Sequence, residues 1–229
     1  NPAAYTAVDM AESELELARK VNSIAPGVMA EEMKKLGGAL IHYSTDYVFD
    51  GEKGTSYTET DTPNPINAYG VTKLEGEQAV HAVGGAALTF RTSWVYSLRV
   101  GGFVNKVLGW ARQQEVMRIV DDQIGSPTWA RMLAEATANM IARGGNDPKA
   151  YLQQYGGLYH LAGAGAASRY EWAREVIQRD PRKEEQVVRQ ILPAKSNEFP
   201  NPAHRPVYSA LDCSKFEKTF GIPLPDWKI

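Results

Sequence analysis

The chain has 229 residues, of which 43% are hydrophobic and 23% are charged, and its formal net charge is −2. This ordinary globular composition gives no electrostatic reason to expect a nucleic-acid or membrane partner. No apolar run approaches the roughly 18 residues of a membrane span. Cys213 is the only cysteine, which excludes an intrachain disulfide and a cysteine-rich metal site. A single thiol favours a reducing, cytoplasmic setting.

Helix and strand patterns alternate along the first half of the chain. Residues 11–20 predict a helix, because acidic side chains come first and basic ones last, as the helix dipole favours. The elements predicted next are a helix at 29–36, a strand at 39–44, a helix from Tyr69 to about 83 that starts near Asn64 and Pro65, and a strand at 87–91. This alternation indicates parallel β/α units.

The second half has shorter strands and more irregular stretches, with prolines at 193, 200, 202 and 206. Its predicted elements are a helix at 103–113, a strand at 117–120, a helix at 128–143 capped by Thr128, a strand at 158–161, a helix from Ser168 to about 179, a strand at 187–192 and a short helix from Asp212 to Gly221. We therefore expect a regular α/β domain in residues 1–125 and a smaller α/β domain in 126–229, whose segments can interleave.

Tyr69 and Lys73 are four residues apart in the predicted helix, so their side chains lie on one face, one turn apart. A lysine in that position favours the phenolate and is expected to lower the pKa of the phenol from about 10. Such a tyrosine can exchange a proton near neutral pH. The spacing alone is weak, because many helices contain it by chance.

Other polar residues follow the neighbouring strands. Thr45 comes directly after the strand at 39–44, and Trp94 ends the run Arg91–Trp94 after the next strand. Open parallel sheets bind ligands at the carboxyl ends of their strands. A hydroxyl, a phenol and a lysine that converge there suit carbonyl reduction, with the hydride supplied by a cofactor.

These motifs together resemble the extended short-chain dehydrogenase/reductases and, more narrowly, the dTDP-4-dehydrorhamnose reductase family. The similarity spans nearly the whole chain in order. It includes Ala3–Asp9, the run His42–Phe49 (HYSTDYVF), Tyr69-Gly70-x-x-Lys73, Arg91–Tyr96, Asp122–Thr128, Tyr159–Leu161 and Arg205-Pro206.

The resemblance implies a Rossmann-like doubly wound parallel sheet with a smaller substrate domain. The implied reaction is the reduction of dTDP-4-dehydro-L-rhamnose to dTDP-L-rhamnose by NADPH or NADH. Tyr69 would donate the proton, Lys73 would bind the nicotinamide ribose, and Thr45 would polarise the carbonyl. Asp46 and Trp94 would contact the sugar.

The remaining implied contacts are to the phosphate and the cofactor. Arg205 would meet a substrate phosphate, and Ala4, Tyr5 and Thr6 would line the cofactor. The scattered histidines give no metal-binding spacing. The resemblance leaves open a requirement for Mg²⁺ and assembly into a homodimer.

One departure concerns the cofactor. The family begins with a strand, a glycine-rich turn and a helix that holds the pyrophosphate. Gly37-Gly38 and Gly84-Gly85 precede strands instead of following them. We therefore expect a sequence that lacks its first β-α units, binds dinucleotide poorly and is inactive by itself.

Two other functions stay open. A nucleotide-sugar epimerase or dehydratase would share Thr45, Tyr69 and Lys73, although dehydratases usually carry an Asp-Glu pair where this chain has Asp46-Tyr47. A non-catalytic regulatory subunit could keep the same fold. Structural roles also compete at single positions: Thr45 could cap a turn, Trp94 could pack, and Arg205 could form a surface salt bridge. His42 is more simply a core or surface residue than a catalytic one.

Overall fold

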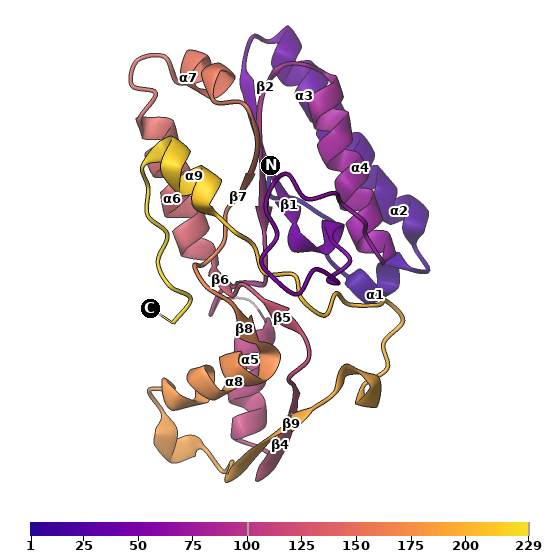
Figure 1. Ribbon diagram of the computed structural model, residues 1–229, viewed down its shortest axis with the longest axis vertical. Helices are drawn as coiled ribbons and strands as arrows, with labels where there is room; N and C mark the ends of the chain where they lie inside the picture. Colours follow the sequence, from indigo (N-terminus) through magenta and orange to yellow (C-terminus); the bar gives the residue numbers. More distant parts are fainter. Residues whose placement is uncertain (100, 229) are drawn as a thin grey trace.

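The computed structural model describes residues 1–99 and 101–228. Its centre is a parallel sheet in the order β1 (Ala39–Thr45), β2 (Ala86–Thr92) and β7 (Gly157–His160) (Figure 1). The register places Thr45 beside Thr92 at the carboxyl edge of the sheet. The last residues of β1 and β2 therefore lie side by side at this edge. The predicted α/β fold with a Rossmann-like parallel sheet is confirmed.

Helices cover both faces of this sheet (Figure 1). One face carries α1 (Val8–Ala11), α2 (Leu15–Arg19), the π-helix η1 (Lys20–Ile24), α3 (Ala25–Lys35) and α4 (Ala68–Ala82). The other carries α6 (Ala130–Ala142), α7 (Pro148–Gln154) and α9 (Ser214–Phe220), around the larger apolar core. No helix among the described residues is long and apolar enough to cross a membrane.

Short elements form the lower half of the molecule (Figure 1). α5 (Phe103–Ala111) and α8 (Arg169–Gln178) pack on the parallel pair β4 (Val116–Val120) and β9 (Gln190–Ala194) around a second core. The remaining elements are β3 (Val95–Tyr96) paired with β6 (Thr128–Trp129), β5 (Ile124–Gly125) paired with β8 (Ala167–Ser168), and the 3₁₀ turns η2 (Asp46–Val48), η3 (Lys183–Glu185) and η4 (Ser196–Glu198).

Two predicted helix starts are wrong. α4 begins after Asn67, not near Asn64 and Pro65, because the Asn67 side chain accepts a hydrogen bond from the Gly70 amide at 2.8 Å. α6 begins after Trp129, which makes no side-chain cap. Thr128 lies in β6 instead, and its hydroxyl donates to the Ser126 carbonyl. The predicted cap at Ser168 is confirmed, as part of a capping box.

A buried ion pair joins α4 to β2. The Arg91 guanidinium donates to both carboxylate oxygens of Glu77, at 2.9 and 2.7 Å, and the two side chains are 2% and 4% exposed. The guanidinium also lies 5.0 Å from the centre of the Phe49 ring. This pair fixes the position of α4, the helix that carries Tyr69 and Lys73, on the sheet.

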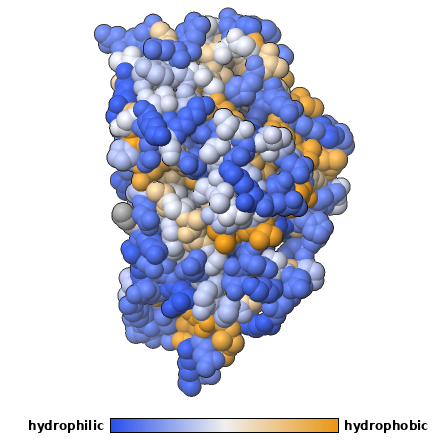
Figure 2. Space-filling view, in the orientation of Figure 1, coloured by the Kyte–Doolittle hydropathy of each residue, from blue (hydrophilic) through white to orange (hydrophobic). Residues whose placement is uncertain are grey.

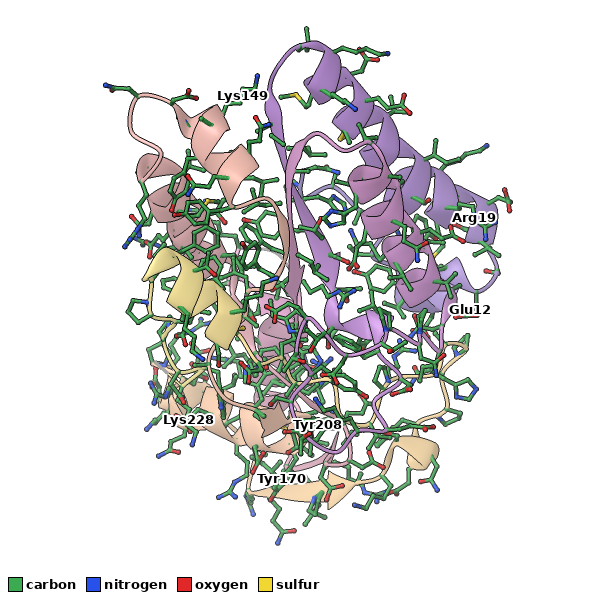
Figure 3. The ribbon with its side chains drawn as sticks, turned by 45° about the horizontal axis from the view of Figure 1, so that its top comes forward. Glu12, Arg19, Lys149, Tyr170, Tyr208 and Lys228 are labelled. Carbon is green, nitrogen blue, oxygen red and sulfur yellow. The ribbon has the colours of Figure 1, made fainter. Side chains whose placement is uncertain are left out.

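Glu77→Gln removes the charge of this pair and leaves the Arg91 guanidinium buried without a counter-ion. We expect the free energy of unfolding to fall by about 3 kcal/mol in urea titrations. Glu75→Gln is the matched control on the same helix: its partner Arg19 is partly exposed on the outer side of the helical layer (Figure 3), so the loss should stay below about 1 kcal/mol. Equal losses in the two variants would contradict this role of Glu77.

Candidate active site

A cleft of about 490 Å³ opens at the carboxyl ends of β1 and β2. Residues from five separate segments of the chain meet there, brought together in part by the strand register and the start of α4. Those lining the cleft include seven of the predicted site residues: Ala4, Thr6, Thr45, Asp46, Tyr69, Lys73 and Trp94. The convergence expected from the strand order is thus seen in the structure.

Lys73 is almost completely buried beneath the cleft, at 2% exposure. Its Nζ donates to the Tyr43 carbonyl at 2.6 Å and lies 3.4 Å from Nε2 of His42. Burial lowers the pKa of Lys73 to about 8, although the Glu77 charge opposes this effect. Both hydrogen-bond partners of the ammonium therefore belong to β1, although Lys73 itself belongs to α4.

The Tyr69 pKa differs from the sequence-based expectation. Burial raises it above the ordinary value, and the nearby Asp46 and Tyr47 act in the same direction. A hydrogen bond with Thr45 opposes the rise. The Lys73 ammonium, expected from its spacing to lower this pKa, is not among the groups that shift it. In this state the phenol keeps its proton, as an acid requires.

Thr45 ends β1 with its hydroxyl in a local network. The hydroxyl accepts from the Tyr47 amide and donates to Oδ1 of Asp46, both at 3.1 Å. The first of these bonds is the turn-capping role that competes with catalysis at this position. Thr45 also lines the cleft, so one hydroxyl caps η2 and faces the ligand space.

Asp46 is buried at 2% exposure, and the hydrogen bonds that its carboxyl group accepts within the described chain all come from hydroxyls. Ser93 and Ser209 donate to Oδ2 at 3.0 and 2.6 Å, and Thr45 donates to Oδ1. Desolvation raises the pKa of Asp46 to about 6, while the three hydroxyls limit the rise. Neither serine was among the predicted site residues.

Trp94 separates this cleft from a second one. Its backbone has φ 43°, the only positive φ of a non-glycine residue in the described chain. Gly125 allows the indole to lie flat, because a Cβ there would be 2.5 Å from the ring. The Arg169 guanidinium stacks on this ring, with Cζ 3.5 Å from the ring centre.

The second cleft has a volume of about 550 Å³ and lies between α5, β4 and the start of α8. Four cations line it together with aromatic side chains: Lys106, Arg118, Arg169 and Arg205. Arg169 takes part in none of the ion pairs among the described residues. Of these cations only Arg205 is predicted from the sequence, because the four are far apart in the chain and share no motif.

Two of the predicted site residues, Tyr5 and Arg205, make contacts with other protein side chains. The Tyr5 hydroxyl donates to Glu14 at 2.5 Å, and its backbone is bound on both sides by the Asn22 carboxamide, so its side chain lies outside the lining of the first cleft. Arg205 forms a two-pronged ion pair with Asp9 at 2.6 and 2.7 Å. It does line the second cleft.

Three polar side-chain atoms in the wall of the first cleft have no hydrogen-bond partner among the described residues. Ser44 Oγ, Thr92 Oγ1 and Trp94 Nε1 are buried without a hydrogen-bond partner in the described chain. A nicotinamide nucleotide carries hydroxyl and carboxamide groups, which are the kinds of group that pair with such atoms. No group of three or more His, Cys, Asp or Glu side chains within 1–99 and 101–228 could hold a metal ion, so nothing supports Mg²⁺.

The family model described as the RmlD substrate binding domain matches residues 1–229. A dTDP-4-dehydrorhamnose reductase of Burkholderia thailandensis is 44% identical to the chain, over all of the chain and 77% of the relative. The chain belongs to the dTDP-4-dehydrorhamnose reductase family. Another member of this family, from Escherichia coli K12, is 38% identical over the whole chain and 75% of its own length.

Solved structures of the family share the fold. The reductase from Clostridium acetobutylicum matches with a TM-score of 0.88 at 35% identity, over 99% of this chain and 75% of that one. The Bacillus anthracis reductase, solved in complex with NADP, matches with a TM-score of 0.86 at 32% identity over the same shares. A UDP-glucuronic acid 4-epimerase from Bacillus cereus, at 19% identity, shows likeness of fold alone.

Asp46→Asn should stabilise the protein at pH 7. Since folding raises this pKa from 3.8 to about 6, the native state loses stability as pH rises from about 4 to 6. The amide avoids that loss, and the gain should reach at most about 3 kcal/mol at pH 7 in urea titrations.

Below about pH 4 this gain should vanish, because both states then carry a neutral carboxyl. Asp61→Asn is the opposite control: Lys53 lowers the pKa of Asp61 to about 2, so its charge stabilises the native state at pH 7. A gain from Asp46→Asn that is independent of pH would refute the desolvation argument.

Proposed function

We propose that the protein reduces dTDP-4-dehydro-L-rhamnose to dTDP-L-rhamnose with NADPH or NADH. The observation that carries the proposal is the meeting of Thr45, Tyr69 and Lys73 in one cleft at the carboxyl ends of parallel strands. The names of the family relatives support the substrate, and the NADP complex of the Bacillus anthracis relative supports NADPH.

The bound cofactor would supply a hydride to the carbonyl carbon of the sugar. Tyr69 would give its phenolic proton to the carbonyl oxygen, so that C=O becomes CH–OH and the phenolate remains. The buried Lys73 ammonium would bind a ribose hydroxyl through the N–H that has no partner among the described residues. The raised pKa of Tyr69 keeps the proton in place until hydride arrives.

Thr45 and Asp46 would hold the sugar. For Thr45 to donate to the carbonyl, its hydroxyl turns away from Asp46, which keeps the hydroxyls of Ser93 and Ser209. Trp94 would contact the sugar ring from the wall of the cleft. These roles are proposals based on the positions of the side chains.

The second cleft would bind the dTDP group. Its cations come from α5, β4, α8 and the loop at Arg205, and guanidinium groups bind phosphate through paired hydrogen bonds. Arg169 is the best placed, because it has no ion-pair partner in the described chain and stacks on Trp94 of the first cleft. A ligand across both clefts would join a sugar at one end to a nucleoside diphosphate at the other.

The competing functions have less support. Tyr47 occupies the position where a dehydratase would carry the glutamate of its Asp-Glu pair. The Tyr47 ring packs edge-on against the Tyr69 ring, with centres 6.0 Å apart. A regulatory subunit would not need Thr45, Tyr69 and Lys73 together in a cleft. Tight association with another enzyme and no turnover in the full-length protein would favour that alternative.

Further parts of the proposal concern organisation. The division into 1–125 and 126–229 remains a prediction, and the pairing of β2 with β7 favours interleaved segments. An exposed apolar stripe on α2, η1 and α3, visible at the right edge of Figure 2, would suit a homodimer: Leu17, Ile24 and Val28. A cytoplasmic location agrees with the free, buried thiol of Cys213.

Tyr69→Phe tests the acid. We expect turnover, followed as NADPH oxidation with the 4-keto sugar nucleotide in the full-length protein, to fall at least about 100-fold with cofactor affinity nearly unchanged. Tyr43→Phe is the control, because this phenol lines the same cleft but bonds to Thr137 at 2.6 Å. Near-normal turnover in Tyr69→Phe would mean that Tyr69 only packs.

Arg169→Met tests the second cleft. Calorimetric titration with dTDP should show affinity at least about tenfold weaker, because a charge-assisted contact to the diphosphate is lost. Arg174→Met is the matched control on α8: that guanidinium lies over Tyr170, in the lower half of Figure 3, and does not line the second cleft. Equal affinity in both variants would place the diphosphate elsewhere.

A further inference from the structure

We propose that His42 is a positioning residue for Lys73: it accepts one ammonium proton through Nε2 and so directs another toward the cleft. The inference rests on the proposed function of the Tyr69–Lys73 site and deepens it. The alternation along β1 turns His42 away from Thr45, and this same alternation turns it toward α4. His42 is completely buried, with Nε2 3.4 Å from Nζ of Lys73.

The geometry accounts for the three protons of the ammonium. One is donated to the Tyr43 carbonyl at 2.6 Å, and a second points to His42 Nε2. Both acceptors belong to β1, so they fix the rotation of the group about its Cε–Nζ bond. The third proton is left for the cleft that Lys73 lines, where a ligand hydroxyl can accept it.

This role requires a neutral imidazole with its proton on Nδ1. Burial lowers the pKa of His42 to about 3, and the Lys73 charge acts in the same direction, so the ring is neutral at physiological pH. The Asn1 carboxamide lies with its nitrogen 3.3 Å from Nδ1, while its oxygen accepts from the Ala3 amide at 3.1 Å. A 180° flip of this carboxamide gives the Nδ1 proton an acceptor oxygen and gives up the exposed bond to Ala3. The ring can then accept at Nε2.

The other ionisable groups near this pair do not replace His42 as an acceptor. Glu77 is bound on both oxygens by Arg91. The Asn1 amino group is a donor, bonded to the Ile41 carbonyl at 2.5 Å. The other titratable groups whose charges act on Lys73 or His42 are Glu77 and His81 on α4 and the amino group of Asn1.

The test measures the Lys73 pKa directly, by ¹³C NMR of the labelled lysine Cε, with the signal assigned from Lys73→Arg. His42→Leu removes the acceptor and should lower the Lys73 pKa by at least about one unit, because the buried ammonium loses a partner. His42→Gln, which keeps an acceptor oxygen, should restore most of the difference.

His160→Leu is the matched control. His160 is also completely buried, its pKa is also lowered to about 3, and its Nδ1 lies 3.0 Å from the Tyr57 carbonyl, in a separate part of the core. This variant should leave the Lys73 pKa unchanged. Equal Lys73 pKa values in His42→Leu and the unmodified protein would overturn the proposal.

A second measurement needs no substitution. Imidazole ¹⁵N shifts at pH 7 should show His42 as the neutral tautomer with an unprotonated Nε2. A proton on Nε2 would overturn the proposal even if His42→Leu did not fold. Neither measurement depends on turnover, so failure here is distinct from failure of the reductase proposal.

Discussion

The removal of charged groups from water along one side of α4 is the constraint on which the site depends. Lys73, Glu77 and Arg91 are almost completely buried, and each has a specific hydrogen-bond partner. An unpaired charge at this depth would be costly, so the helix has one favourable position on the sheet. That position sets where Tyr69 meets the ends of the strands.

The same desolvation explains the unusual ionisation in the cleft. It makes Lys73 a weaker base, Asp46 a weaker acid and Tyr69 a phenol that holds its proton. All three shifts favour the neutral form of the group, as burial does in general. A proton transfer between such groups requires little reorganisation of water, because the groups are already largely removed from it.

The sequence was sufficient for the parts of the site that depend on local spacing and strand order. Tyr69 and Lys73 share a helix face, and Thr45 follows a strand, so their meeting follows from rules of parallel sheets. Tertiary contacts decided the rest. Ser209 reaches Asp46 across 163 positions of sequence, and Tyr5 turns to Glu14 for its hydrogen bond. The direction of the Tyr69 pKa depends on burial, which no spacing reveals.

The stack of Arg169 on Trp94 has a consequence for the length of any ligand that spans both clefts. The Trp94 indole lines one cleft and the Arg169 guanidinium lines the other, and the two groups stack with Cζ 3.5 Å from the ring centre. Close contact with Gly125 restricts the indole. The distance from Tyr69 to this cation is therefore set by the protein. For the ligand proposed above, this stack would select molecules by the separation between the reducible carbonyl and the anionic group.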